Sequence, residues 1–448
     1  MADARPVWIK DPLAILAEGA ERGVVVADGR IAELVPKAAQ PKTPGVTPFE
    51  AGEHVVIPGL INTHHHFYQT LTRAVPAALD RELFPWLKTL YPIWAKLTPE
   101  ALDLAVTVAM AELMLSGCTT TTDHHYVFPK GLEAAVDIEV AAAKRLGLRV
   151  LLTRGSMNLS ERDGGLPPDT VVQDQDAILA DSQRVIERHH QRGEDAMVQI
   201  ALAPCSPFSV TTSLMRATAV LAQKLGVRLH THLAETEDEN RFCNELYKCR
   251  PTDYLENCGW LNDSTWLAHG IHFDANEMKR LARHGVTVSH CPCSNQTLAS
   301  GVCPVCELEE AGVTVGLGVD GSASNDASNL MQEVRAAFLV QRARYGVGKV
   351  SHRDALRWAT KGSAACFGRP ELGDIAPGKR ADLALFKLDE LRFSGHGDPI
   401  AALVVCGAHR ADRVMVNGRW TVENGTIPGL DIADLMRRHQ AAARRLQA

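Results

Sequence analysis

Short apolar runs alternate with longer segments of helical periodicity through most of the chain beyond residue 58. The short runs are rich in apolar and β-branched residues, which is typical of buried strands, and the longer segments carry apolar residues every three or four positions, which is typical of amphipathic helices. This pattern predicts strands at 117–123, 149–152, 198–203, 227–232, 265–269, 287–290 and 314–319. Helices are predicted at 99–116, 131–146, 170–192, 213–225, 251–256, 275–284 and 307–311.

A further apolar run at 55–61 leads into His64 and is interpreted as the end of the first strand. The series then has eight strands, or nine if every candidate forms. Regular alternation of strand and helix implies parallel strands, and eight parallel strands close into a barrel. We therefore predict an α/β protein with a (β/α)8 TIM barrel that spans residues 58–370.

Both ends of the chain lack this alternation. Short strands at 24–27 and 30–35 flank an Asp-Gly turn, and strands at 373–386, 404–406 and 413–420 follow the helices at 329–345 and 351–365. Since no helices separate them, these strands predict one small, discontinuous, β-sandwich-like domain built from residues 1–57 and 371–448. It would end in an amphipathic helix at 432–446.

Composition narrows the class of protein. A chain of 448 residues with 46% hydrophobic and 22% charged residues is typical of a globular protein with an ample core. A net charge of -6 without charge runs disfavours nucleic acid and anionic membranes as partners. Without a leader-like or spanning stretch, the expected location is cytoplasmic. The eleven cysteines are expected to be reduced thiols, and a structural zinc site is disfavoured because the first pair is Cys-x-Cys; the clustered ones are Cys291, Cys293, Cys303 and Cys306.

Histidines gather where the predicted strands end. His64 and His66 would point to one face of a strand and His65 to the other, although an isolated His-x-His pair fits a metal site and a polar strand end about equally well. The C-terminal strand ends of a barrel carry its working residues. Those ends hold a set of nitrogen and oxygen donors, namely His64, His66, His230, His232, Glu235, His269, His290 and Asp320.

Four of these groups would hold one divalent metal ion, zinc in the first place and iron as the alternative, and would leave a position for water: His64, His66, His232 and Asp320. Glu235 lies three residues beyond His232, where it could shuttle protons, and His269 could orient the water. Taken singly, Glu235 in its acidic stretch fits a surface carboxylate better, and His269 fits a hydrogen-bonded core residue better. Their common position at strand ends favours the catalytic interpretation.

Six segments together resemble the amidohydrolase superfamily, and within it the branch of cytosine, guanine and triazine deaminases and chlorohydrolases: 58–66, 230–236, 267–270, 290–295, 318–321 and 373–383. The resemblance runs in order from about residue 20 to residue 420. It implies a distorted (β/α)8 barrel with a composite β-domain and one metal ion on the four ligands named above. It also implies that Glu235 is the proton shuttle, that His269 positions the attacking water, and that Asp320 both binds metal and accepts a proton.

Segments 62–73, 83–87 and 203–209 narrow the expected substrate. Relatives that act on nucleosides usually carry a histidine where Cys205 stands, so a free purine base is favoured, with 8-oxoguanine first and guanine or a hydroxytriazine of the hydroxyatrazine type as alternatives. The product from 8-oxoguanine would be urate. Cys205 or Ser206 could face the extra oxygen of an oxidised purine.

Three further residues are candidate substrate contacts. Gln69 offers both a donor and an acceptor to a base edge. Trp86 could form an apolar wall, or be an ordinary packed aromatic, and Arg73 could contact substrate or make a structural salt bridge. We expect a small heterocycle as the partner and a homo-oligomeric enzyme.

Two other classes are disfavoured. A catalytically silent barrel should have lost metal ligands, whereas every expected position is filled here. A nucleic-acid editor of the cytidine deaminase type would need His-x-Glu and Pro-Cys-x-x-Cys, which the chain lacks.

Overall fold

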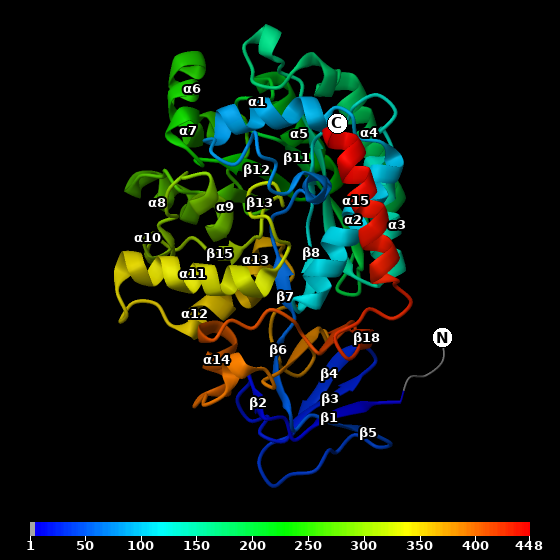
Figure 1. Ribbon diagram of the computed structural model, residues 1–448. Coiled ribbons are helices and arrows are strands. Elements are labelled where there is room, and N and C mark those ends of the chain that lie inside the picture. Colours follow the sequence, from blue (N-terminus) through cyan, green and yellow to red (C-terminus); the bar gives the residue numbers. More distant parts are fainter. Residues whose placement is uncertain (1–4) are drawn as a thin grey trace.

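The computed structural model describes residues 5–448 and has a parallel barrel at its centre (Figure 1). Eight strands form it in the spatial order β15-β14-β13-β12-β11-β10-β8-β7, and β9 (His124–His125) pairs with β10 beside this path. At the seam between β7 and β15, the Thr63 N–H donates to the Leu317 carbonyl (3.0 Å). The predicted α/β barrel is therefore confirmed, with strands β7 (Leu60–Asn62), β8 (Cys118–Thr121), β10 (Arg149–Ser156), β11 (Val198–Pro204), β12 (Leu229–Leu233), β13 (Thr265–His269), β14 (Thr287–His290) and β15 (Val315–Leu317).

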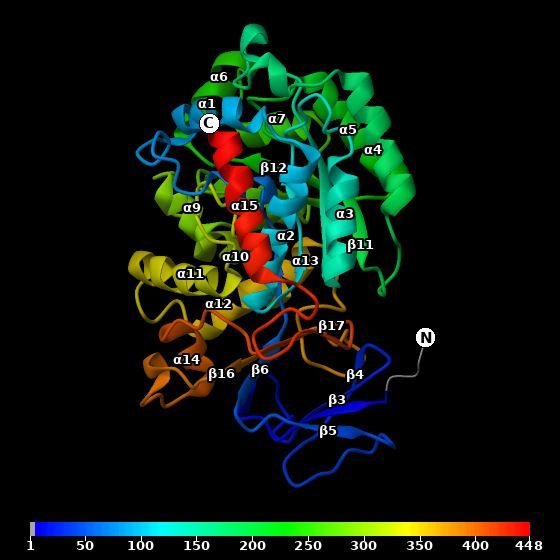
Figure 2. The same cartoon turned by 45° about the vertical axis from the view of Figure 1, so that its right-hand side comes forward.

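Helices surround the barrel in both views (Figures 1 and 2). Local capping explains where several begin: Thr98 caps α2 ahead of Pro99, and Asp274 forms a capping box with Glu277 at α8. Helices α1, α6 and α9 were not predicted from the sequence. The helices are α1 (Leu83–Trp94), α2 (Pro99–Leu115), α3 (Ala135–Leu146), α4 (Gln175–His189), α5 (Thr212–Leu225), α6 (Glu237–Tyr247), α7 (Pro251–Asn257), α8 (Ala275–Arg283), α9 (Pro292–Thr297), α10 (Val305–Glu310), α11 (Leu330–Tyr345), α12 (His352–Arg357) and α13 (Ser363–Cys366).

Short helical turns complete the barrel part. The 3-10 turn η1 (Phe67–Thr72) follows directly on the histidine triplet, and the π-helical turn η4 (Trp358–Gly362) joins α12 to α13. Three more 3-10 turns lie at η2 (Glu161–Asp163), η3 (Asp169–Val171) and η5 (Leu391–Phe393). Among residues 5–448, no helix combines the length and the apolar character needed to cross a membrane.

Two small sheets lie beneath the barrel in both figures; one consists of N-terminal strands, and the other combines strands from the two ends of the chain. One has the order β4-β3-β1-β5 and the other β18-β17-β16-β6-β2, with β6 antiparallel to β16. A separate cluster of buried apolar residues, including Ile9, Val24, Val56 and Leu383, joins the two sheets. The strands are β1 (Val7–Lys10), β2 (Ala14–Ile15), β3 (Gly23–Ala27), β4 (Arg30–Leu34), β5 (Thr47–Glu50), β6 (His54–Pro58), β16 (Leu383–Lys387), β17 (Arg413–Val416) and β18 (Arg419–Val422). The proposed domain boundaries at residues 57 and 371 stay a prediction.

The apolar run at 55–61 is not one strand. It divides into β6, which belongs to a small sheet, and β7, which belongs to the barrel. Gly59 separates the two, and a Cβ atom at this position would lie 2.2 Å from the Thr119 side chain. Glycine therefore permits the close approach at which the chain passes from one sheet to the other.

One strand predicted for the C-terminal region is wrong. Residues 404 and 405 belong to helix α14 (Pro399–Val405) and Cys406 is its C-cap, because Asp398 accepts hydrogen bonds from the first-turn amides and Pro399 occupies the first helical position. The predicted C-terminal helix forms as α15 (Ile432–Gln447) and packs on α2 and η1 of the barrel, while its assignment to the composite β-domain stays a prediction. The side-chain amide of Gln447 donates to the Leu71 carbonyl (2.7 Å), so α15 contacts and stabilises η1, the turn that follows the histidine triplet.

Candidate active site and metal centre

Four predicted ligands converge at the C-terminal ends of the barrel strands, and all four are buried. His64 and His66 follow β7, His232 lies on β12, and Asp320 follows β15. Asp320 Oδ1 lies 3.4 Å from His64 Nε2 and 3.3 Å from His66 Nε2, and His232 Nε2 lies 3.2 Å from His66 Nε2. His65 points away and contacts the Ser328 hydroxyl, as strand alternation predicts.

Hydrogen bonds to the outer nitrogens fix the tautomers of two of these histidines. The Nδ1 atom of His66 lies 2.8 Å from the carbonyl of His124, and that of His232 lies 2.7 Å from the carbonyl of Cys205. A carbonyl oxygen only accepts, so each Nδ1 carries the proton. In the neutral ring the inward Nε2 is then a bare lone pair, which is the form that binds metal.

His64 reaches the same state through a second histidine. The Nδ1 of His230 donates to the Trp266 carbonyl (2.8 Å), which leaves its Nε2 as an acceptor. That Nε2 lies 2.8 Å from His64 Nδ1, so His64 donates outward and turns a bare Nε2 inward. His230, a strand-end residue to which the sequence assigned no role, therefore sets the tautomer of His64.

This donor set fits a divalent metal ion. Two bare nitrogens face each other between His66 and His232, and the buried Nε2 of His64 has no hydrogen-bond partner among the described residues. Burial lowers the pKa of His64 well below its usual value and that of His232 to about 3, so both rings are neutral at physiological pH. Three imidazole nitrogens and a carboxylate form a set typical of zinc or iron sites.

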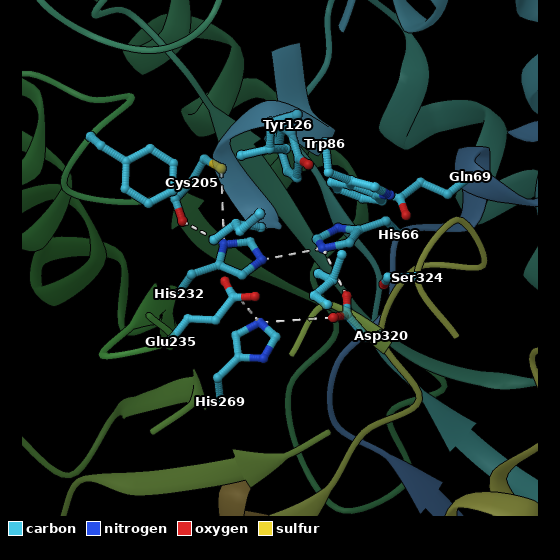
Figure 3. A pocket seen from close by; sticks show the side chains of 14 residues that line it. His66, Gln69, Trp86, Tyr126, Cys205, His232, Glu235, His269, Asp320 and Ser324 are labelled. Carbon is cyan, nitrogen blue, oxygen red and sulfur yellow. Dashed lines mark hydrogen bonds and ion pairs between the residues drawn. The ribbon is translucent and has the colours of Figure 1, made fainter. Parts of the chain in front are cut away.

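Glu235 and His269 lie beside this group (Figure 3). His269 ends β13, and its Nε2 lies 3.5 Å from Glu235 Oε2 and 3.8 Å from Asp320 Oδ2. Its Nδ1 lies 2.9 Å from Asn295 Oδ1, which holds the ring in place. Burial raises the pKa of the Glu235 carboxyl well above its usual range, and the charge of Asp320 raises it further.

The loops that carry these residues turn through unusual backbone conformations. Ala234, His269 and Asp320 have φ values of 54°, 71° and 64° in the left-handed region, which non-glycine residues seldom adopt. Each lies at or just beyond the end of a barrel strand. Such strain clusters at functional sites, where surrounding contacts hold side chains in a required direction.

A cavity opens onto the cluster (Figure 3). Gln69, Trp86 and Cys205 line it, together with the apolar side chains of Leu83, Leu87, Phe208 and Leu298. The buried Gln69 Nε2 has no partner among the described residues, so it is a free donor. The Trp86 indole N–H donates to the Ala323 carbonyl (3.3 Å), which fixes the orientation of the ring.

Two residues proposed as substrate contacts do not line the cavity. Arg73 forms an ion pair with Glu112 on α2, so its guanidinium makes a structural salt bridge. Ser206 is engaged with the Ser209 hydroxyl (2.7 Å). His290, although at a strand end, contacts Gln341 outside the cavity.

Tyr126 is a cavity residue that the sequence did not indicate. It follows β9, immediately after His124 and His125, at the end of another barrel strand, and that position was the available signal. Burial raises its pKa well above the usual value, so the phenol stays protonated and can donate. The eleven cysteines are free thiols, and none belongs to a metal-capable group within residues 5–448.

A second buried group lies behind His66 and consists of Asp123, His125 and Glu139. The Nε2 of His125 donates to the Val127 carbonyl (2.9 Å), so its Nδ1 is bare and lies 3.1 Å from Glu139 Oε1. Burial raises the pKa of Glu139 to about 8 and lowers that of His125 to about 4. At neutral pH, Glu139 is therefore mostly protonated beside a neutral His125 ring.

This arrangement predicts a pH-dependent contribution to stability. A pKa raised on folding means that the native state holds the extra proton, so the contribution of Glu139 is complete below its unfolded pKa and is lost as pH rises toward 8. We expect the difference in unfolding free energy between wild type and Glu139→Gln to fall by up to about 1.4 kcal/mol per pH unit between pH 5 and 8. Denaturant unfolding of both proteins measures it, and parallel curves would contradict the assignment.

The sequence is similar over nearly its whole length to a protein family and to several characterised enzymes. The sequence model of the Amidohydrolase family matches residues 55–421. The 8-oxoguanine deaminase of Pseudomonas aeruginosa is 60% identical over 444 residues, which cover 98% of this chain and 99% of that protein. The hydroxydechloroatrazine ethylaminohydrolase of Pseudomonas sp. strain ADP is 36% identical and covers 94% of this chain and 91% of its own length.

Solved structures resemble the whole molecule. The atrazine chlorohydrolase of Arthrobacter aurescens, crystallised with zinc, superposes with a TM-score of 0.91 at 31% identity and covers 98% of this chain and all of its own. The similarity therefore extends over the barrel and the two small sheets together.

Proposed function

The chain belongs to the amidohydrolase family, and from this premise we propose that it hydrolytically deaminates a free purine base, 8-oxoguanine, to urate and ammonia. The observation that carries the proposal is the full-length 60% identity to an 8-oxoguanine deaminase. The donor set and the cavity of the described structure support it. The enzyme is accordingly a metal-dependent aminohydrolase.

The metal would be held by His64, His66, His232 and Asp320, and zinc is the proposed ion. A bound divalent metal supplies a Lewis acid that lowers the pKa of water toward neutrality. The hydrogen bonds at the outer nitrogens keep the three imidazoles in the ligating tautomer without further rearrangement.

Proton transfer is the proposed task of Glu235. In its ionised form, this carboxylate would take a proton from the attacking water and give it to a ring nitrogen, and its raised pKa makes it a better proton acceptor than an ordinary carboxylate. His269 faces both Glu235 and Asp320 and would orient the water between them. Asp320, through its second oxygen, would then take the remaining hydroxyl proton and pass it to the amine, which leaves as ammonia.

The cavity offers complementary groups to an oxidised purine. The free Gln69 amide would donate to a base oxygen, and the fixed Trp86 ring would cover one face of the heterocycle. Burial raises the pKa of Cys205 to about 12, so its thiol stays neutral and would face the extra oxygen. A zinc cofactor, a homo-oligomeric state and a cytoplasmic location complete the proposal.

A screen of ammonia release across 8-oxoguanine, guanine, isocytosine, cytosine and hydroxytriazines tests this function. We expect kcat/KM for 8-oxoguanine to exceed that for guanine by roughly 10- to 100-fold, because one polar contact left unmade costs about 1–3 kcal/mol. The resemblance to an ethylaminohydrolase makes hydroxytriazines the second candidate class. Absence of ammonia release from every purine by the metal-loaded enzyme would refute the proposal.

A further inference from the structure

Glu239, like Glu235 but unlike the exposed Glu237 and the half-buried Asp238, has a buried side chain. It lies in the first turn of α6, where the Thr236 hydroxyl accepts its backbone N–H (3.4 Å). Burial of a carboxyl group carries a large desolvation cost, which must be offset by specific contacts. Glu239 makes its contact with the segment that follows β12 and carries the candidate catalytic residue Glu235.

That contact is with the backbone of Glu235. The Glu235 N–H donates to Glu239 Oε2 (3.0 Å), directly after the left-handed Ala234. The Ala234 carbonyl in turn accepts the N–H groups of Ile271 (2.8 Å) and His272 (2.9 Å). The strained turn at Ala234 and Glu235 is thus held by two contacts. One is with the Glu239 side chain on α6, and the other is with the loop after β13.

The held turn sets where the Glu235 carboxylate lies. Glu235 Oε2 is 3.5 Å from His269 Nε2, and both residues sit on neighbouring loops tied together by these amides. A small rotation of the Glu235 backbone would swing its carboxylate away from His269. Misplacement of a reacting group by about 1 Å can cost about 10²-fold in rate.

We propose that Glu239 is a positioning residue, which fixes the backbone of Glu235 and so directs the proton-shuttling carboxylate toward His269 and the bound base. This inference rests on the proposed deaminase function for its kinetic consequence, while its geometric consequence is independent of substrate. The hydrogen bond requires only an acceptor oxygen at the Oε2 position.

Substitution of Glu239 by glutamine and by leucine separates the need for an acceptor oxygen from the need for a negative charge. Burial raises the pKa of Glu239 to about 8, so a neutral amide resembles its predominant form at pH 7 and keeps the acceptor oxygen. We expect Glu239→Gln to retain kcat within about threefold and Glu239→Leu to lose about 10²-fold in kcat, with KM and metal content little changed. Glu245→Leu, an exposed glutamate of the same helix, is the matched control and should be unaffected.

Three outcomes would overturn the proposal. These are a Glu239→Leu enzyme with wild-type kcat, a Glu239→Gln enzyme as slow as Glu239→Leu, and failure of both Glu239→Leu and Glu239→Ala to fold, which would assign the residue to the fold alone. A crystal structure of Glu239→Leu gives a second measure, since we expect the Glu235 carboxylate to leave His269. If the wild type deaminates no base, the proposed function fails, but an undisplaced Glu235 in that structure would refute the positioning role by itself.

Discussion

Replacing Glu235 with glutamine should leave one metal ion per chain and lower kcat by about 10³-fold. The amide occupies nearly the same volume but cannot carry a proton between water, ring nitrogen and leaving amine. Glu235 is not within the nitrogen and carboxylate cluster that fits a metal, so the ion should stay. Metal analysis of the purified variant beside steady-state ammonia release measures both effects.

A matched control distinguishes this loss from a general change in charge. Glu237 lies two residues along the same acidic stretch but is exposed, and Glu237→Gln should keep wild-type turnover. A Glu235→Gln enzyme that retains full activity would remove the proton-shuttle role. One that loses its metal would show instead that the carboxylate helps to hold the ion.

The barrel and the convergence of the four candidate metal ligands were predictable because the information for them is local. Alternation along a strand places His64 and His66 on one face, and the rule that parallel strands end at a common rim brings distant residues such as His232 and Asp320 together. Neither inference needs the positions of other side chains. The convergence of these four residues in the structure follows from periodicity and topology alone.

Other features depend on contacts between distant segments, which periodicity does not encode. The apolar run at 55–61 crosses from one sheet to another because Gly59 meets Thr119. Arg73 is an ion-pair partner of Glu112 and not a cavity residue, which becomes apparent only once α2 is packed. The tautomer of His64 likewise depends on a carbonyl that His230 reaches on the neighbouring strand.

One error could have been avoided by local physical reasoning. The apolar residues at 404–406 resemble a strand, yet Asp398 followed by Pro399 is a typical helix start. The acidic stretch at 235–239, in contrast, could not have been interpreted correctly from local sequence alone. Its buried carboxylates, Glu235 and Glu239, cannot be told from the more exposed Glu237 and Asp238 in the sequence, and only packing separates the two kinds.

Replacing His232 with alanine should remove the metal and with it all measurable deamination. The variant lacks one of three inward-facing nitrogens, and His66 Nε2 loses the neighbour that lies 3.2 Å away. Loss of even an outer-shell partner typically weakens metal binding by about 10- to 100-fold, so loss of a direct ligand should exceed 10²-fold. Metal analysis after dialysis should find less than one tenth of an equivalent of metal, against one equivalent in wild type.

Thermal unfolding gives an independent measure of the same site. A ligand that binds only the native state stabilises it in proportion to RT ln(1 + [L]/Kd), so added zinc should raise the Tm of metal-stripped wild type but not that of His232→Ala. The exposed His284 offers a matched control, and His284→Ala should behave as wild type. If His232→Ala retained a full equivalent of metal and its zinc-dependent rise in Tm, the ion would have to rest on another donor group. The group that links His64 with His269 and Asp320 would then be the site to test, because its donor atoms also lie within reach of one another.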